Sequence, residues 1–313
     1  MTFSRFPLRV GTRPSLLAQT MAAECMSALR AAVPGLAHEA AMKLVPISTS
    51  GEWRPDQGEQ CLTHMGGHKG LFAKELQQAL QSNVIDIAVH SLKDMENFSP
   101  KGLTLAAYLP RHDARDAFLS PFAATLDQLP QGSVVGTASV RRKAQLLAMR
   151  PDLQVVPLRG NVDTRLEKLW RGQVPAAVMA YAGLARLGHI DRVTSIIPVN
   201  QMVPAVGQGV IAMEIRESDE DIAAMMAEIN HAETAVCVAA ERAFVAALNG
   251  SCQTPIGGLA TLEGDQITLT GFVASVDGTH QLRETRAAPR HEAANLGRHL
   301  AHDMLAKAPW WTP

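Results

Sequence analysis

The apolar positions in the first part of the chain predict short strands that alternate with amphipathic helices. Residues 8–11 are typical of a short buried strand, and apolar positions then recur at helical spacing over 16–33. A second strand is predicted over 42–48, a helix over 71–80 and a third strand over 85–89. This order is typical of α/β proteins with a largely parallel sheet.

A second series of strands and helices begins near Asp116. Strands are predicted over 133–136, 154–158 and 176–180, and each of them leads into a helix. The strand-to-helix junctions carry arginine, at Arg141, Arg142, Arg159, Arg165 and Arg186. Arginine in the first turn of a helix opposes the helix dipole, so simple solvation of a helix surface explains these positions poorly. We expect these side chains to converge on carboxylates or phosphates.

The remaining pattern predicts a hinge and a separate C-terminal unit. Residues 203–209 combine proline with glycine, and the strand predicted over 210–215 is expected to return to the first sheet. A helix over 232–248 follows. Three strands near 258–262, 266–274 and 280–286 and a helix over 291–306 complete the chain. Antiparallel strands with helices on one side suit this unit.

The segment around Cys252 is expected to be a tight loop. Gly250 suits the left-handed position that ends a helix, and Pro255 cannot continue one. A thiol just beyond a helix C-terminus faces the negative end of the dipole, which does not favour a thiolate. Cys252 would therefore be a poor activated nucleophile but a reasonable permanent attachment point. A small residue that fills a corner is the alternative.

Two further positions suggest binding chemistry in the first domain. Arg13 and Ser15 lie where a helix begins, and main-chain N–H groups at a helix N-terminus favour an anion. The strand over 85–89 leads into Lys93 and Asp94, at the strand end where open α/β sheets bind ligands. For Asp94 the alternative is a loop carboxylate that caps a neighbour or pairs with Lys93. Residues 50–70 are rich in glycine and predict a mobile loop.

Composition excludes several classes of function. The chain has 313 residues with 47% apolar residues, and its 29 basic and 30 acidic side chains give a net charge of −1. A nucleic-acid partner is therefore not indicated. The 4 cysteines are far apart, and neither a signal peptide nor a long apolar span is recognisable, so we expect a reduced cytoplasmic setting without a membrane partner. His64 and His68 are four apart on a glycine-rich stretch, and no metal site is predicted.

A series of motifs occurs in order along nearly the whole chain. They are G-T-R-x-S at 11–15, G-L-F-x-K-E-L at 70–76, D-I-A-V-H-S-L-K-D at 86–94, V-G-T-x-S-x-R-R at 135–142, L-R-G-N-V-x-T-R at 158–165, P-A-V-G-Q-G at 204–209 and G-S-C-Q-x-P-I-G at 250–257. Together they closely resemble the porphobilinogen deaminase family, also called hydroxymethylbilane synthases. The resemblance implies a monomeric transferase of tetrapyrrole and heme biosynthesis. Four porphobilinogen molecules are joined head to tail into hydroxymethylbilane, with ammonia released at each step.

The resemblance also implies a domain organisation. The fold class expected is α/β, with two domains similar to type II periplasmic binding proteins and a smaller C-terminal α+β domain. Domain 1 would comprise 1–112 and 204–229, domain 2 would comprise 113–203, and domain 3 would comprise 230–313.

Individual residues receive roles from the same resemblance. Cys252 matches the cysteine that carries the covalent dipyrromethane cofactor as a thioether, and Asp94 matches the catalytic carboxylate. Loss of ammonia leaves a cationic azafulvene, which a nearby carboxylate stabilises, and the carboxylate can also assist proton transfer. The positions that match cofactor contacts are Lys93, Ser139, Arg141 and Arg142. Those that match substrate contacts are Arg13, Ser15, Arg159, Arg165 and Arg186.

The chain departs from the family pattern at three places. Gly66-Gly67-His68-Lys69-Gly70 stands where the family usually has Gly-Gly-Lys-Gly, Met95-Glu96 stands where Val-Pro is common, and Met21 stands where a glutamine is expected. The rival hypothesis is a non-catalytic, two-lobed binding protein for a carboxylate-bearing ligand. The lack of an export signal and the unit that carries Cys252 both disfavour that hypothesis.

Overall fold

The computed structural model describes residues 7–50, 73–251 and 254–312. The chain divides into two compact units. The first contains the described residues of 1–52, 69–111 and 210–235, and the second contains those of 112–209 and 236–313.

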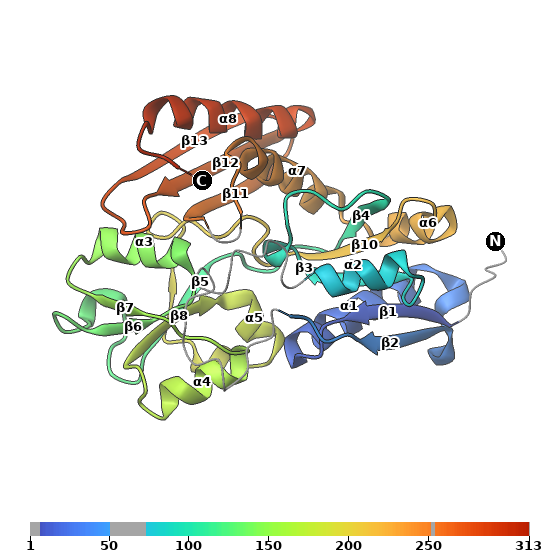
Figure 1. Cartoon of the computed structure of the whole chain (residues 1–313), viewed down its shortest axis with the longest axis horizontal. Helices are drawn as coiled ribbons and strands as arrows, with labels where there is room; N and C mark the ends of the chain where they lie inside the picture. Colours follow the sequence, from blue (N-terminus) through green and yellow to red (C-terminus); the bar gives the residue numbers. More distant parts are fainter. Residues whose placement is uncertain (1–6, 51–72, 252–253, 313) are drawn as a thin grey trace. The chain divides into compact units, whose positions relative to one another are not determined.

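The first unit is built on a five-stranded mixed sheet (Figure 1). In spatial order its strands are β2 (Met42–Pro46), β1 (Leu8–Thr12), β3 (Ile87–Ser91), β10 (Ile211–Arg216) and β4 (Leu103–Tyr108). β1 is parallel to β2 and β3, whereas β10 is antiparallel to β3 and β4. The chain therefore returns to the first sheet after the hinge, as predicted.

Helices cover both faces of this sheet, and the alternation of side chains on β3 shows how. Ile87 and Val89 belong to a core shared with α1 (Leu16–Ala32) and α6 (Glu220–Ile229). Ala88 points to the opposite face and packs in a core with α2 (Lys74–Gln81). Short 3-10 turns complete the unit at η1 (Pro34–Leu36), η2 (Glu39–Ala41) and η5 (Leu92–Asp94).

The second unit contains a five-stranded sheet of the same plan. Its strands are, in spatial order, β7 (Gln154–Val156), β6 (Val134–Gly136), β8 (Ala176–Ala180), β5 (Asp116–Leu119) and β9 (Ser195–Ile197). β6 is parallel to β7 and β8, and β5 is antiparallel to β8 and β9. The helices and turns of this region are α3 (Val140–Met149), α4 (Val162–Trp170), α5 (Tyr181–Arg186), η6 (Leu126–Gln128) and η7 (Ile190–Arg192).

In each five-stranded sheet one strand runs antiparallel to both of its neighbours. It is the first strand that forms after the chain has left the other five-stranded sheet. β10 plays this part in the first sheet and β5 in the second. This shared topology confirms the predicted pair of similar α/β sheets.

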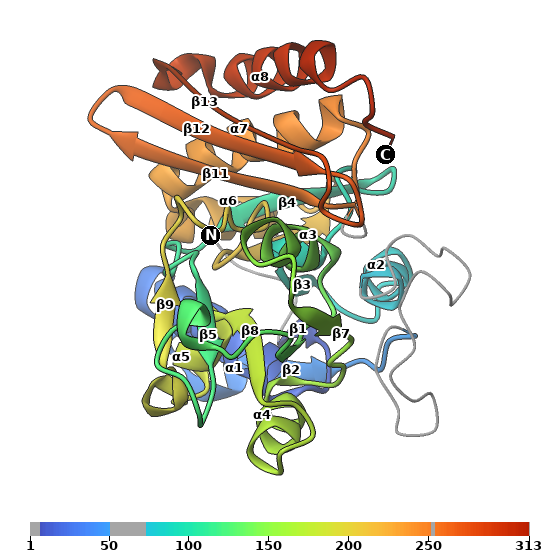
Figure 2. The same ribbon diagram turned by 90° about the vertical axis from the view of Figure 1, so that its left-hand side faces the viewer.

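The C-terminal part is a three-stranded antiparallel sheet with helices on one face (Figure 2). It consists of β11 (Ile256–Glu263), β12 (Gln266–Ala274), β13 (Gln281–Pro289), α7 (Ala232–Ala247), η8 (Arg290–Glu292) and α8 (Ala293–Lys307). A Cβ at Gly271 would contact Phe244 of α7 and Leu300 of α8, so both helices lie on the same face of β12. The predicted arrangement is confirmed. Ala144 of α3 packs with Phe272 and Ala274 of β12 in a separate small core, within the same unit.

Several details differ from the sequence-based predictions. The third strand occupies Ile87–Ser91 rather than 85–89, which places His90 and Ser91 within the strand. β4, β5 and β9 were not predicted, because each is a short apolar run without clear alternation. The three-domain boundaries stay a prediction.

The end of α7 also differs from the prediction. The left-handed residue is Asn249, with φ 52°, and not Gly250. Asparagine tolerates this conformation better than most residues with a side chain. A Cβ at position 250 would overlap Ile256 Cδ1, so the end of that side chain would have to shift. Cys252 and most of the predicted mobile loop over 50–70 lie outside the described residues.

Candidate active site

A pocket in the first unit lies where β1 and β3 end. Its lining residues are Arg13, Ser15, Leu17, Ala18, Met21, Ala73, Val89, His90, Ser91, Lys93, Asp94 and Met95. β1 and β3 are parallel neighbours, so their C-terminal ends lie at the same edge of the sheet. The structure thus brings together four residues that the sequence assigned to binding or catalysis: Arg13, Ser15, Lys93 and Asp94.

The junction between β1 and α1 forms one wall of the pocket. Ser15 is the N-cap of α1, and its Oγ accepts a hydrogen bond from the Ala18 N–H at 3.4 Å. Thr12 is fully buried and donates from Oγ1 to the Ala18 carbonyl at 2.9 Å. The partial positive charge of the α1 N-terminus is therefore directed toward the pocket, next to the half-buried guanidinium of Arg13. This wall suits a carboxylate ligand.

The turn after β3 forms the opposite wall and carries Asp94. A single 3-10 turn, η5, follows the strand, and the Met95 N–H donates to the Leu92 carbonyl at 3.1 Å. Asp94 and Lys93 are both half-buried. Both side chains belong to residues that line the pocket.

Behind the pocket lies a buried polar group that the sequence reasoning missed. His90 Nε2 lies 3.1 Å from Glu214 Oε2, and Gln77 Nε2 donates to Glu214 Oε1 at 3.1 Å. Glu214 is fully buried in β10, and His90 is 6% exposed. A signal was present in the sequence, since Glu214 is the one acidic residue in the otherwise apolar run 210–215. A buried carboxylate is rare unless it is paired.

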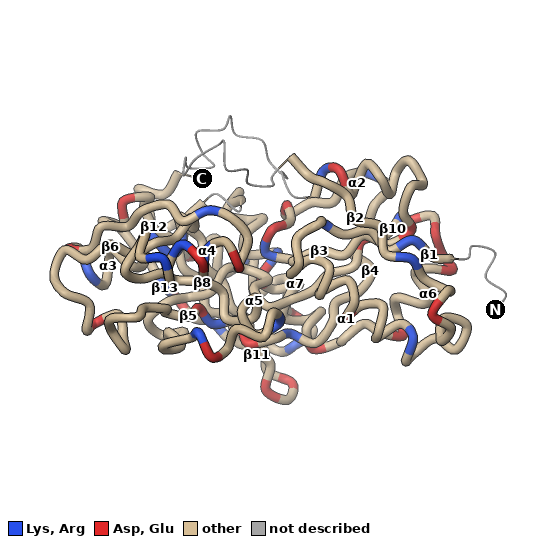
Figure 3. The backbone as a smooth tube through the Cα atoms, turned by 90° about the horizontal axis from the view of Figure 1, so that it is seen from below, with Lys and Arg blue, Asp and Glu red and all other residues tan. Residues whose placement is uncertain are grey.

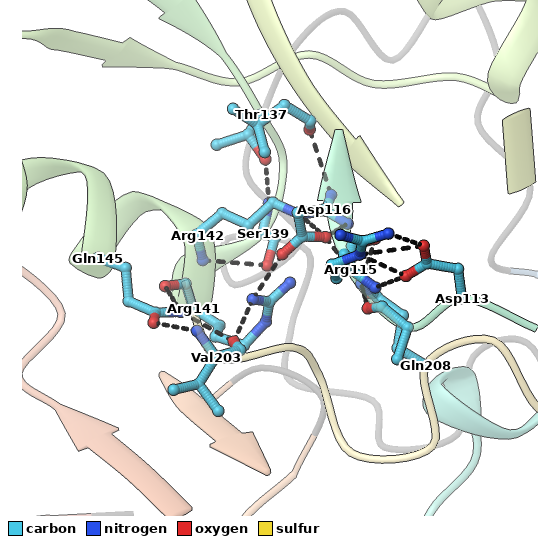
Figure 4. Close-up of polar contacts among 12 residues, drawn as sticks. Asp113, Arg115, Asp116, Thr137, Ser139, Arg141, Arg142, Gln145, Val203 and Gln208 are labelled. Atoms are coloured by element: carbon cyan, nitrogen blue, oxygen red, sulfur yellow. Dashed lines mark hydrogen bonds and ion pairs between the residues drawn. The ribbon is translucent and has the colours of Figure 1, made fainter. Parts of the chain in front are cut away.

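The arginines of the second unit divide into two groups. Arg141 and Arg142 lie in the first turn of α3 and are only 3% and 5% exposed. Both pair with the fully buried Asp116 at the start of β5, each at an N···O distance of 2.8 Å (Figure 4). These side chains therefore have an internal carboxylate as their partner. Ser139 is the N-cap of α3 and accepts from the Arg142 N–H at 3.4 Å.

The Asp116 network extends into the hinge. Burial alone would raise the pKa of Asp116, but the charges of Arg141 and Arg142 outweigh burial and hold that pKa well below its usual range. Gln208 Nε2 donates to Asp116 Oδ1 at 2.8 Å and to the Ala114 carbonyl at 2.7 Å. Arg141 Nη1 also donates to the Val203 carbonyl at 2.6 Å. The network therefore links the start of α3 to the segment before β5, through Ala114, and to the segment after β9, through Val203 and Gln208.

The other three predicted arginines have different environments. Arg159 is 4% exposed and precedes α4, and Arg165 lies in the second turn of α4, where its Nε donates to the Gly160 carbonyl at 2.8 Å. Arg186 ends the six-residue helix α5, and its Nη2 donates to the Gly209 carbonyl at 3.1 Å. The arginines near the strand-to-helix junctions therefore differ in their positions relative to the helix dipole. Arg141 and Arg142 lie in the first turn of α3, while Arg186 favours the dipole at a helix C-terminus.

Basic and acidic residues alternate along the rest of the chain without a large region of one sign. Basic and acidic segments are interspersed in Figure 3, in keeping with the net charge of −1. None of the helices formed by the described residues is long and apolar enough to span a membrane.

Family models match both parts of the chain. Residues 8–224 match a model described as porphobilinogen deaminase, dipyromethane cofactor binding domain, and residues 235–306 match one described as porphobilinogen deaminase, C-terminal domain. The chain belongs to the porphobilinogen deaminase family. Porphobilinogen deaminase of Paracoccus denitrificans is 46% identical over 303 residues, which cover 97% of this chain and 95% of that relative. The enzyme of Nitrobacter hamburgensis is 47% identical over 302 residues, 96% and 93% of the two chains.

Solved structures with a comparable fold are far less similar in sequence. A periplasmic substrate-binding protein of an ABC transporter from Coxiella burnetii is 13% identical, with a TM-score of 0.44 over 72% of this chain and 92% of the other. The methionine-binding protein MetQ is 14% identical, with a TM-score of 0.42 over 71% and 87%.

The predicted porphobilinogen deaminase resemblance is thus confirmed, and with it the activity and the cofactor of that family. The enzyme is a transferase of tetrapyrrole biosynthesis that joins porphobilinogen units into hydroxymethylbilane on a dipyrromethane primer. The primer carries acetate and propionate groups, and the described residues fit such a group: Arg13, Lys93 and the α1 N-terminus supply positive charge in one pocket.

Proposed function

We propose that Asp94 is the catalytic carboxylate of this porphobilinogen deaminase and that Cys252 carries its dipyrromethane as a thioether. The observation that carries the proposal is the pocket in which Asp94 lies together with Arg13, Ser15 and Lys93. A single carboxylate is flanked there by cationic and N–H groups. Such a pocket can hold the acidic side chains of a pyrrole while it presents one negative charge to the reacting atoms.

The residues divide the work of the reaction. Arg13, Ser15 and Lys93 bind and orient carboxylates, and Asp94 stabilises the positive charge that develops when the C–N bond of porphobilinogen breaks. When it is bound, dipyrromethane supplies the pyrrole to which the first substrate molecule is joined. Arg159, Arg165 and Arg186 are proposed to hold substrate carboxylates as the chain grows. Arg141, Arg142 and Ser139 are proposed to support the cofactor.

The finer organisation is also proposed. Domain 1 comprises 1–112 and 204–229, domain 2 comprises 113–203 and domain 3 comprises 230–313. The enzyme is proposed to act as a cytoplasmic monomer without a nucleic-acid partner. Cys25 and Cys237 are buried and form no disulfide, which supports the cytoplasmic setting, and the net charge of −1 supports the lack of a nucleic-acid partner. Light scattering of the purified enzyme tests the monomer.

The experiment that tests the attachment is intact-mass analysis of the purified enzyme and its variants. Cys252→Ser is expected to remove the covalent adduct and to abolish product formation. Cys25→Ala and Cys237→Ala are the matched controls, since burial raises the pKa of the Cys25 thiol to about 12 and leaves it protonated and unreactive. An adduct that survives Cys252→Ser, or that disappears with Cys25→Ala, contradicts the assignment.

A further inference from the structure

The pocket that holds Asp94 contains a second group able to carry a proton. His90 lines the same pocket, at the end of β3, three residues before Lys93. Its environment differs from that of Asp94. His90 is 6% exposed and Asp94 is half-buried, so the imidazole lies deeper in the pocket wall than the carboxylate does.

The sheet fixes the position of this imidazole. In the antiparallel register of β3 and β10, His90 pairs with Ala212 and Ala88 pairs with Glu214. His90 and Glu214 are therefore diagonal neighbours on the same face of the sheet, close enough for long side chains to meet. Gln77 reaches Glu214 from α2, which covers that face. Both oxygens of the fully buried carboxylate are thereby occupied.

The chemistry of these groups defines the form of the imidazole. If the Glu214 carboxylate is ionised, it can only accept hydrogen bonds, and Nε2 of His90 then carries the hydrogen in the 3.1 Å contact. Nδ1 of a neutral His90 then has a free lone pair. A carboxylate that holds one ring nitrogen of a histidine leaves the other as a proton acceptor with a fixed tautomer and orientation.

The reaction has a proton that must be removed from carbon. The C–N bond of the substrate breaks and its electron pair leaves with ammonia, so that the methylene carbon becomes the cationic centre. The unsubstituted α-carbon of the pyrrole that ends the growing chain donates an electron pair to this methylene, which forms the new C–C bond. That α-carbon must then lose its proton to restore the aromatic ring. In each coupling one C–N bond and one C–H bond break, and one C–C bond forms. The ammonia and the proton that are released together make one ammonium ion.

We propose that His90, oriented by Glu214, accepts the α-carbon proton in this step, while Asp94 stabilises the preceding cation. The proton passes from Nδ1 to ammonia or to water. The imidazole contacts Glu214 on β10, and Gln77 of α2 binds the other oxygen of that carboxylate. The charged residues that line the same pocket are Lys93 and Asp94 in η5 and Arg13 before α1. The inference rests on the proposed role of Asp94, because it divides the reaction between the two side chains.

The test first adds one porphobilinogen unit to the enzyme, either ordinary or deuterated at its unsubstituted ring carbon, so that this unit ends the growing chain. It then measures single-turnover coupling of the next, ordinary porphobilinogen to each chain. His90→Gln keeps a neutral hydrogen-bonding side chain but cannot accept the proton, so coupling is expected to slow by about 10²-fold. Removal of the proton then limits the rate, and a primary deuterium isotope effect is expected in His90→Gln that is absent or smaller in the wild-type enzyme. A role confined to packing α2 on the sheet would lower stability without creating an isotope effect.

Glu214→Gln provides a second variant in case His90→Gln does not fold. It keeps the shape of the carboxylate and its contact with Gln77, but it no longer requires hydrogen on His90 Nε2. We expect slower coupling with an isotope effect in the same direction. His231→Gln is the matched control, because His231 is a half-buried histidine of the first unit that bonds to Thr234 and does not line the pocket.

A readout independent of turnover is the ¹⁵N spectrum of histidine-labelled enzyme, with His90 assigned from its absence in His90→Gln. The proposal predicts a neutral ring with hydrogen on Nε2, and a changed tautomer balance in Glu214→Gln. Hydrogen on Nδ1 of the wild-type ring, or unchanged coupling without an isotope effect in folded variants, overturns the proposal. Normal turnover by Asp94→Asn would instead overturn the proposed function, so the two failures are distinguishable.

Discussion

The Asp94 pocket and the Asp116 network use the same kinds of side chain in opposite ways. Each has an aspartate near two basic residues at the end of a strand or the start of a helix. In the first unit Asp94 and Lys93 are half-buried and line an open pocket. In the second unit Asp116 is fully buried, and Arg141 and Arg142 pair with it at 2.8 Å.

The difference shows how burial separates a chemical role from a structural one. A buried carboxylate between two arginines has its charge neutralised and its oxygens occupied, so it stabilises a local arrangement rather than a ligand. A half-buried carboxylate beside cationic groups keeps a charge that a substrate can meet. The same arginines can still influence the reaction, because their position depends on Asp116 and Gln208.

The largest contrast is expected when the two aspartates receive the same substitution. Asp116→Asn leaves two buried arginines without their counter-charge, which is expected to lower the free energy of unfolding by about 3–5 kcal/mol. Asp94→Asn changes a half-buried side chain and is expected to alter it by no more than about 0.5 kcal/mol. Urea unfolding of both variants measures the contrast. Equal losses of unfolding free energy in the two variants would contradict the distinction between a structural Asp116 and a catalytic Asp94.

A smaller difference is expected between the two groups of arginines. Arg142→Leu removes a partner of the buried Asp116, so it is expected to reduce both stability and the fraction of enzyme that carries the cofactor. Arg165→Leu removes a half-buried side chain that bonds to the Gly160 carbonyl, so folding should persist while elongation stalls at intermediate lengths. Intact mass of the enzyme after a brief pulse of substrate reports both outcomes. Normal elongation by Arg165→Leu contradicts the binding role of that residue.

Acid should remove the contribution of Asp116 to stability. The folded pKa of Asp116 is lowered, so its contribution to stability is present above the unfolded pKa of about 3.9 and is lost as pH falls below that value. The difference in unfolding free energy between wild type and Asp116→Asn should therefore shrink below about pH 4. Unfolding curves at several pH values check this sign, and a difference that grows on acidification would contradict it.

The smallest effects concern the two N-cap serines, one in each region. Ser15→Ala and Ser139→Ala each remove a side-chain acceptor from a helix start, which costs about 1 kcal/mol of stability. Only Ser15 lines the pocket, so only Ser15→Ala is expected to raise the KM for porphobilinogen as well. A KM that rises with Ser139→Ala but not with Ser15→Ala would contradict the assignment of Ser15 to the binding pocket.

Much of this organisation could be predicted from the sequence, for physical reasons that differ between the two regions. The strand that leads to Asp94 and the helix that begins after Arg13 have clear periodicity, and parallel strands bring their ends to one edge of the sheet. The residues that meet in the pocket could therefore be predicted from the sequence. The short strand of Asp116 has no alternation, so its carboxylate was not recognised as the partner of Arg141 and Arg142. A count of arginines at helix starts cannot reveal an internal counter-charge.

Two other features depended on packing that the sequence pattern does not show. Glu214 meets His90 across two strands that are 124 residues apart in the chain, a pairing that local pattern does not encode. The left-handed conformation after α7 falls on Asn249, and the neighbouring Gly250 packs closely against the end of the Ile256 side chain. In both cases tertiary packing decided what local propensity left open.

The most direct test of the central claim is single-turnover ammonia release by Asp94→Asn and Asp94→Glu, each confirmed by intact mass to carry the cofactor. If the negative charge of Asp94 stabilises the cation, Asp94→Asn should be slowed by about 10²–10⁴-fold, whereas Asp94→Glu should retain more activity because the charge moves by only one methylene. Near-normal release by Asp94→Asn would remove Asp94 from the mechanism.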